Sequence, residues 1–209
     1  MAKNDADVKL KSLADFFHRN LTIILVLTII VLMIHAFHEK QTLVDDAFIS
    51  FRYAKNLVEG NGLVWNPGER VEGYTNFLWT ILFSLGLKLG LKVETITLIL
   101  AIPIHLICLI LTFLLAMKVL KSRSLAFIAL LLVGFNHSIS AFAPSGMETP
   151  LYLCEHLLAA YLFFLGLENG WKPGRLIMLS VVLCLTLMTR PDAVILIAVS
   201  YTHLTLPTN

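Results

Sequence analysis

Charged residues are scarce in this sequence. Asp, Glu, Lys and Arg make up 14% of its 209 residues, against about 25% in an average soluble domain. Hydrophobic residues make up 57%, where about 45–50% is usual, and the mean hydropathy is +0.81. These figures exclude a disordered chain and an ordinary soluble enzyme, and they indicate an integral membrane protein.

Cysteine is scarce as well. The three cysteines, Cys108, Cys154 and Cys184, all lie inside apolar runs, and no two are spaced as CxxC. This pattern excludes a disulfide-stapled secreted domain and a zinc finger, so we interpret the cysteines as small membrane-buried hydrophobes. The net charge of +2 is too small to indicate binding to nucleic acid, and we expect no such partner.

The first apolar run, Leu21–Phe37, follows four basic residues. A cleaved signal peptide is the competing interpretation, but no small-x-small cleavage site follows the run. We therefore expect an uncleaved signal anchor, with residues 1–20 forming a cytoplasmic N-terminal segment.

Six further apolar runs predict an all-α, polytopic transmembrane helix bundle. A bilayer requires roughly 17–25 apolar residues per span. Two of the runs, the first with fifteen residues and the last with seven, need a separate explanation for their length. The runs are Phe77–Leu91, Val93–Met117, Leu125–Phe142, Pro150–Leu167, Leu176–Met188 and Ala193–Val199.

The run Phe77–Leu91 has fifteen residues, which is short for a span. If it does not span, the short basic loops near residues 118–123 and 172–175 fall in the cytoplasm, as the positive-inside rule favours. We therefore expect an interfacial or partly inserted helix on the outer face, with Lys88 and Lys92 snorkelling toward water.

The end of the sequence is the second anomaly. Ser200–Asn209 interrupts a span after seven apolar residues and resembles translated sequencing-adapter read-through. A half-span would leave backbone groups unpaired in lipid. We expect residues 200–209 to be non-native, and residues 21–199 to be a truncated transmembrane domain of a longer protein.

An acidic pair opens the first outer loop, residues 38–76. Asp45 and Asp46 precede a helically spaced apolar series, which predicts an amphipathic helix starting near the pair and ending before Gly60. One carboxylate could cap this helix; the other is then left to act as a base or to bind a cation. The apolar series is Ala47, Phe51, Ala54 and Val58.

Three further groups of residues face the same side in this topology. Trp65, Arg70, Glu72 and Tyr74 suit sugar stacking and phosphate pairing, or alternatively form an aromatic belt with solvated charges. Glu148 is either a functional acid between two spans or a helix N-terminal acid favoured by the dipole.

The last of the three groups contains Arg190 and Asp192. Arg190 either meets a phosphate or snorkels while paired with Asp192. A divalent-metal site of His35, His38 and Asp45 is an open alternative, although we expect no metal cofactor and assign no metal ligand.

Two stretches, 45–57 and 60–75, closely resemble bacterial GT-C membrane glycosyltransferases, with terminal arabinofuranosyltransferases of mycobacterial walls as similar examples. Residues 145–151 and 190–192 also resemble motifs of this family. The resemblance covers roughly residues 20–198. Members have more spans and often a soluble C-terminal domain, which this sequence does not contain.

The resemblance implies a GT-C bundle in the bacterial inner membrane with its active site on the extracytoplasmic face. It implies an inverting transfer from a polyprenyl-phosphate sugar donor to an envelope glycan or lipid acceptor. It makes Asp45 the general base with Asp46 beside it. It also implies phosphate contacts from Arg52, Arg70 and Arg190, and sugar or acceptor contacts from Glu72, Tyr74 and Glu148.

A transporter or flippase of lipid-linked sugars is the competing class, because it also needs acids and arginines at membrane boundaries. Transporters concentrate such groups at the midplane, often within internal repeats. Here the groups are expected on one face and no repeat is evident, which favours the transferase. A non-catalytic membrane scaffold is a third interpretation.

Overall fold

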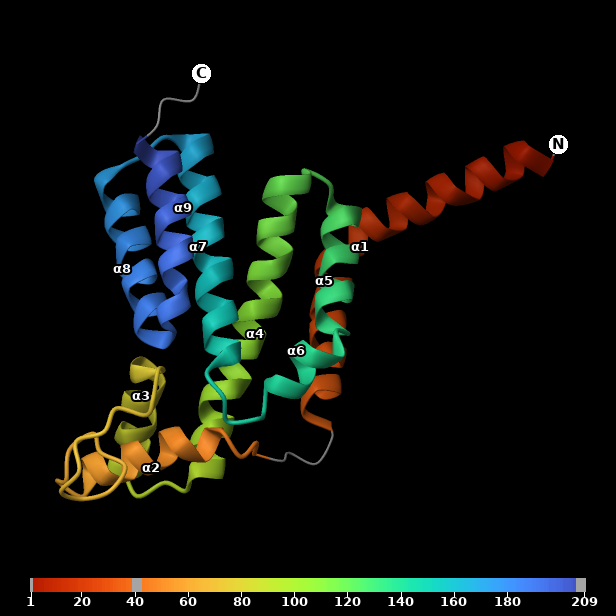
Figure 1. Cartoon of the computed structure of the whole chain (residues 1–209). Coiled ribbons are helices and arrows are strands. Elements are labelled where there is room, and N and C mark those ends of the chain that lie inside the picture. Colours follow the sequence, from red (N-terminus) through yellow and green to blue (C-terminus); the bar gives the residue numbers. More distant parts are fainter. Residues whose placement is uncertain (1, 39–42, 206–209) are drawn as a thin grey trace.

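The computed structural model describes residues 2–38 and 43–205. Within these residues the chain forms nine α-helices, one 3-10 helix and no β-strand (Figure 1). The prediction of an all-α bundle is confirmed.

Three helices are long and apolar enough to cross a membrane: α1 (Ala2–His38, with its apolar part from Arg19), α4 (Val93–Leu120) and α7 (Thr149–Asn169). These helices confirm the expected spans at their positions. The central helix is α4, which packs between α7 and α5 (Arg123–Gly134). Beyond α7 lie α8 (Pro173–Thr189) and α9 (Val194–Thr205).

The expectation of one continuous helix from Leu125 to Phe142 is wrong. The structure divides it into α5 and a separate short helix, α6 (His137–Phe142). The break follows from Asn136, whose side-chain oxygen accepts a hydrogen bond from the backbone N–H of Ile139 at 3.2 Å. An Asn at this position caps a new helix start, so the apolar composition alone overstated the length of the helix.

The last apolar stretch also differs from expectation. After η1 (Pro191–Ala193), α9 runs through Val199 to Thr205 without a break. The expected helix interruption at Ser200 is therefore wrong, whereas the non-native origin of Ser200–Asn209 stays a prediction. Residues 206–209 of that tail lie outside the described residues.

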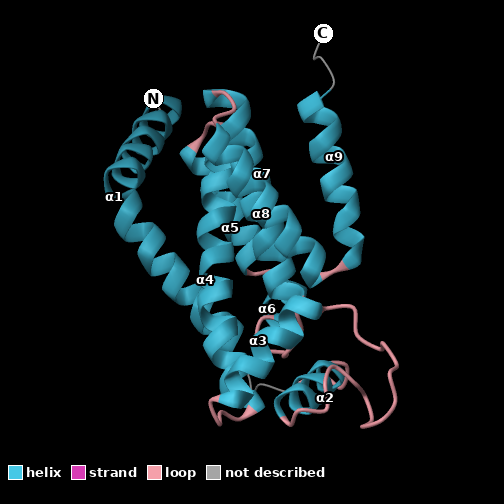
Figure 2. Ribbon diagram, turned by 90° about the vertical axis from the view of Figure 1, so that its left-hand side faces the viewer, coloured by secondary structure: helices cyan, strands magenta, loops and turns pink. Residues whose placement is uncertain are grey.

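The remaining two helices, α2 (Ala47–Val58) and α3 (Phe77–Lys88), lie together at one end of the bundle (Figures 1 and 2). The α4–α5 and α7–α8 connections, which carry the basic residues, lie at the opposite end. With 12 residues, α3 is too short to cross a membrane, as predicted. It contacts α2, α4 and the end of α8.

The predicted amphipathic helix is confirmed as α2. Its residues Ala47, Phe51 and Ala54 are buried, and they form one core with Trp79 and Phe83 of α3, which Ile96 of α4 completes. After the helix ends, Gly60 adopts φ +84, a conformation that favours glycine. This core fixes α2 against the α3–α4 hairpin.

Close packing at Gly86 provides a test of this arrangement. In Gly86→Ala the new Cβ would lie 2.6 Å from Cγ1 and 2.7 Å from Cδ1 of Ile96, which is 3% exposed. Because Ile96 has no space to move into, we expect the free energy of unfolding to fall by about 1–3 kcal/mol. Thermal unfolding in detergent micelles measures it.

The matched control is Gly174→Ala in the first turn of α8. No atom lies within 4 Å of its new Cβ, so we expect the unfolding temperature to stay the same or to rise slightly. Equal destabilisation by both variants would contradict the close packing of α3 on α4.

Candidate active site

The acidic pair stands at the exposed start of α2. Asp46 occupies the N-cap position, but its side chain forms no capping hydrogen bond. Within residues 43–205, neither the Asp45 nor the Asp46 carboxylate has a hydrogen-bond or ion-pair partner. The capping alternative is therefore wrong for this structure, and both carboxylates face solvent at this end of the bundle.

The segment 145–151 lies against Val44 and Ala47, the two residues that flank the acidic pair. The backbone N–H of Val44 donates to the carbonyl oxygen of Ser145 at 3.1 Å. Next to it, the indole N–H of Trp79 donates to the carbonyl oxygen of Gly146 at 2.8 Å. Gly146 has φ +83, and a Cβ there would lie 3.1 Å from that of Ala47. Only glycine allows this turn to approach the start of α2 so closely.

A buried polar network continues from α2 into the bundle. Asn76 occupies the N-cap position of α3, and its amide bonds with the Ser50 hydroxyl of α2. The same amide donates to Oε2 of Glu148 at 2.9 Å. Asn76 is 8% exposed and Glu148 is 5% exposed. The end of the first loop is thus joined to the segment 145–151 inside the bundle.

Arg190, in the segment 190–192, completes the network. Its Nη1 lies 3.8 Å from Oε1 of Glu148, and its Nε lies 3.4 Å from Oδ1 of Asp192. The guanidinium also lies over the ring of Tyr152, with its carbon 5.4 Å from the ring centroid. The Arg190 side chain is 41% exposed, so solvent reaches part of it.

Arg52 lies in a different environment. Its Nε donates to the carbonyl oxygen of Trp65 at 2.9 Å, and its Nη2 donates to Oδ1 of Asn66 at 2.6 Å. The guanidinium carbon also lies 4.2 Å from the centroid of the Trp65 ring. These contacts hold the loop that follows α2, residues 59–76, against that helix. A phosphate contact by Arg52 stays a prediction.

Tyr74 is half-buried against Tyr53, with ring centroids 4.7 Å apart. Burial raises the pKa of Tyr74, and the negative charge of nearby Glu72 raises it further. Its phenol therefore remains a neutral hydrogen-bond donor. Arg70 and Glu72 are exposed, and neither forms a hydrogen bond or ion pair within the described part of the chain.

Ser50, Asn76 and Trp79 belong to the network, and sequence reasoning did not select them. An Asn before an apolar helix usually reads as an ordinary cap or turn residue. In the structure the Asn76 side chain forms no cap hydrogen bond and turns instead to Ser50 and Glu148. No feature of the sequence distinguishes these two uses.

The residues suggested for a metal site do not converge in the described structure. The His35 ring lies against Phe135, with centroids 5.3 Å apart. Within residues 2–38 and 43–205, no three His, Cys, Asp or Glu side chains are grouped so that they could hold a metal ion.

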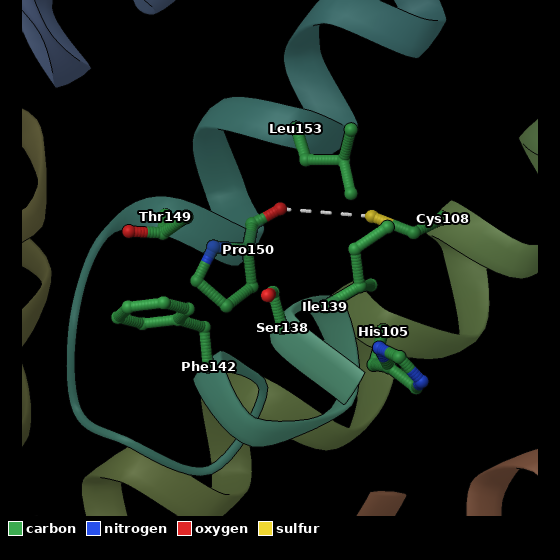
Figure 3. A pocket seen from close by; sticks show the side chains of 8 residues that line it. All are labelled: His105, Cys108, Ser138, Ile139, Phe142, Thr149, Pro150 and Leu153. Carbon is green, nitrogen blue, oxygen red and sulfur yellow. Dashed lines mark hydrogen bonds between the residues drawn. The ribbon is translucent and has the colours of Figure 1, made fainter. Parts of the chain in front are cut away.

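A small apolar cavity lies beside the start of α7 (Figure 3). Its volume is about 220 Å³, and residues of α4, α6 and the first turns of α7 line it. Thr149, the residue after Glu148, forms part of its wall, so the cavity adjoins the polar network. The lining residues are His105, Cys108, Ser138, Ile139, Phe142, Thr149, Pro150 and Leu153.

Two curated enzymes match the chain, and both are named terminal beta-(1->2)-arabinofuranosyltransferase. The enzyme from Mycobacterium tuberculosis is 37% identical over 75 residues, which cover 35% of this chain and 12% of that enzyme. The enzyme from Corynebacterium glutamicum is 31% identical over 134 residues, which cover 63% of this chain and 20% of that enzyme. The predicted resemblance to terminal arabinofuranosyltransferases is confirmed.

The chain spans a fifth or less of the length of these curated relatives. No family model matches the chain. No solved structure matches it at a significant level either.

The Asn76 network provides a second stability test. In Asn76→Ala the buried Glu148 loses its amide donor, and Ser50 loses its side-chain partner. An unsatisfied buried polar group costs about 1–3 kcal/mol, so we expect a clear fall in the unfolding temperature in detergent. Asn169→Ala is the control, because this exposed residue bonds only to the carbonyl of Leu165 in its own helix. Equal unfolding temperatures for the two variants would contradict the network.

Proposed function

We propose that the protein is a membrane glycosyltransferase of GT-C type. It transfers a sugar from a polyprenyl-phosphate donor to an extracytoplasmic glycan or lipid acceptor, with inversion at the anomeric carbon. The similarity to arabinofuranosyltransferases supports a glycosyltransferase, and the donor and the mechanism are our proposal.

One observation carries this proposal: unpartnered carboxylates and a half-exposed arginine are joined through adjacent loops at one end of an apolar bundle. Val44, next to Asp45, is hydrogen-bonded to Ser145. Three residues further along the chain, Glu148 pairs with Arg190. A base for the acceptor and a cation for the leaving phosphate are the two groups that the proposed reaction needs.

The residues support the following chemistry. An acceptor hydroxyl is a poor nucleophile at neutral pH, so Asp45 removes its proton as the oxygen attacks the anomeric carbon. The bond from that carbon to the phosphate oxygen breaks, and the polyprenyl phosphate leaves with the electron pair. Arg190 stabilises the negative charge that develops on this leaving group. The transferred proton then passes from Asp45 to solvent.

The network supports a division of roles among the other residues. Glu148 is buried and occupied by Asn76 and Arg190, so we propose that it orients Arg190 and thereby acts on the donor indirectly. Arg70, Glu72 and Tyr74 are at least partly accessible on the outer loop. We propose that they bind the acceptor or the sugar, and that Arg52 acts mainly by shaping this loop.

The apolar cavity beside α7 supports a lipid-linked donor. It adjoins the segment that carries Glu148, and it is bounded by membrane helices. We propose that it accommodates part of the polyprenyl chain while the phosphate lies near Arg190. We further propose that the bundle lies in a bacterial inner membrane, with α2 on the extracytoplasmic face.

The catalytic proposal is tested with Asp45→Asn in the full-length protein. The amide cannot accept the proton, so we expect transfer from a polyprenyl-phosphate sugar to fall about 10²–10⁴-fold. Folding should be unaffected, because the Asp45 side chain has no structural partner within residues 43–205. Asp46→Asn is the matched control for charge at this position, and we expect a smaller effect. Transfer is measured in purified membranes.

Near wild-type transfer by Asp45→Asn would remove Asp45 as the base and leave Asp46 as the candidate. If Asp45→Asn, Asp46→Asn and the double variant all remained active, the acidic-pair mechanism would be wrong.

The topology is tested by cysteine labelling. Asp46→Cys, Lys121→Cys and Lys172→Cys are introduced singly into a protein whose native cysteines have been replaced. Asp46 is the N-cap residue of α2, Lys121 the C-cap residue of α4 and Lys172 the N-cap residue of α8. Because α2 lies at the opposite end of the bundle from the α4–α5 and α7–α8 connections, we expect an impermeant maleimide to label only position 46 on intact cells. Labelling at 121 but not at 46 would reverse the proposed orientation.

A further inference from the structure

Two buried acids lie on the same face of α7. Glu148 precedes the first residue of the helix, and Glu155 follows seven residues later, about two turns on. Both are buried, with 5% and 7% exposure, yet the reaction proposed above uses only Glu148. A buried ionisable group in a membrane helix is costly, and apolar substitution of buried ionic groups often leaves stability unchanged. A role beyond stability is therefore indicated for Glu155.

Adjacent residues at the end of α8 contact these two acids. The hydroxyl of Thr189, the last residue of α8, lies 3.0 Å from Oε1 of Glu155 and 3.0 Å from the carbonyl oxygen of Leu185 in its own helix. Its one proton is therefore shared between these two acceptors. Arg190 then leaves the helix with extended backbone, φ −153 and ψ 133, and its side chain reaches Glu148. Neighbouring residues of one chain segment are thus held at two points along a single face of α7.

The other contacts between α7 and α8 constrain the position of the end of α8 less. Further along the two helices the interface is a cluster of buried apolar side chains, Ala159, Leu162, Leu179 and Val182. Apolar burial is non-directional, so it holds the helices together without fixing the end of α8 as a hydrogen bond does. The bond between Thr189 and Glu155 provides that directional constraint.

We propose that Glu155 is a positioning residue for Arg190. It holds Thr189 and so sets where the Arg190 guanidinium meets the phosphate of the donor; this inference rests on the proposed function. Glu155 does not itself touch the donor. Only Oε1 is engaged, and within the described residues Oε2 has no hydrogen-bond partner. A glutamine, which retains one acceptor oxygen, should therefore serve in its place.

The first test measures the KM and kcat of the full-length protein for a polyprenyl-phosphate sugar. We expect Glu155→Leu and Thr189→Val each to raise KM for the donor about tenfold, with a smaller change in kcat, because a displaced Arg190 weakens phosphate binding. Glu155→Gln and Thr189→Ser keep the hydrogen bond and should stay within about twofold of the wild type. A loss in Glu155→Gln as large as in Glu155→Leu would overturn the hydrogen-bond route.

Thr186→Val is the matched control. Thr186 is fully buried one turn earlier in α8, and like Thr189 it donates to a carbonyl of its own helix, that of Val182. Unlike Thr189, it forms no hydrogen bond to α7 within the described residues. Removing this hydroxyl should leave KM for the donor unchanged. If Thr186→Val raised KM as much as Thr189→Val, a general disturbance of α8 would explain both and the proposal would be wrong.

A double-mutant cycle separates positioning from a purely structural role. Arg190→Ala should raise KM about tenfold to a hundredfold by removing the phosphate contact. In that background Glu155→Leu or Thr189→Val should add almost nothing, because no guanidinium remains to be positioned. Additive losses would show that Glu155 acts independently of Arg190. Thr189→Val, which preserves side-chain shape, keeps the cycle informative if Glu155→Leu unfolds.

The outcomes for the two proposals are distinguishable. If the wild type uses no polyprenyl-phosphate sugar, the proposed function fails and this inference falls with it. If the wild type and Arg190→Ala behave as expected while Glu155→Leu and Thr189→Val keep wild-type KM, only the positioning role of Glu155 is overturned.

Discussion

The buried carboxylate of Glu148 is the interaction on which the rest of the site depends. One oxygen accepts a hydrogen bond from Asn76 and the other faces Arg190. A single side chain thus joins the residue before α3 to the residue after α8. An unpaired charge at 5% exposure would be strongly unfavourable in an apolar bundle. Glu148 therefore requires both neighbours, and this requirement brings together segments that lie far apart in the sequence.

The short helix α3 makes this convergence possible. If α3 crossed the membrane, Asn76 and the acidic pair would lie at one end of the bundle, and Glu148 and Arg190 would lie at the other. Instead, α3 packs on α2 and α4 through one core, and its first turn meets the end of α8. The large side chains Trp79 and Phe83 fill that core. The Gly86 contact with Ile96 lets the two arms of the hairpin approach closely.

Much of this arrangement follows from the sequence, and the exceptions have physical causes. The lengths of the apolar runs predict the three long spans, and the helical spacing of apolar residues predicts α2. Length and charge together identified α3 as too short to cross. Apolar length failed at Phe135–Asn136, because one capping side chain ends a helix without changing the mean hydropathy. It also overstated the break at Ser200, where the polar residues remain helical.

The site was harder to derive than the fold, because the sequence reveals residue type but not the partner of each side chain. Asp45, Glu148 and Arg190 stood out because charges are scarce in an apolar chain, and the structure brings their segments to one end. Two arginines of similar appearance have different neighbours: Arg52 donates to Trp65 and Asn66 of the loop that follows α2, whereas Arg190 lies beside the carboxylates of Glu148 and Asp192. From the sequence alone, Asn76 looks like an ordinary helix cap and Glu155 looks like an ordinary helix residue. Only their neighbours in the structure distinguish them. Sequence reasoning of this kind therefore finds charged residues that stand at the boundaries of apolar runs. It does not find a side chain such as Asn76 or Glu155, whether charged or not, whose role depends on the neighbour that it contacts in the folded structure.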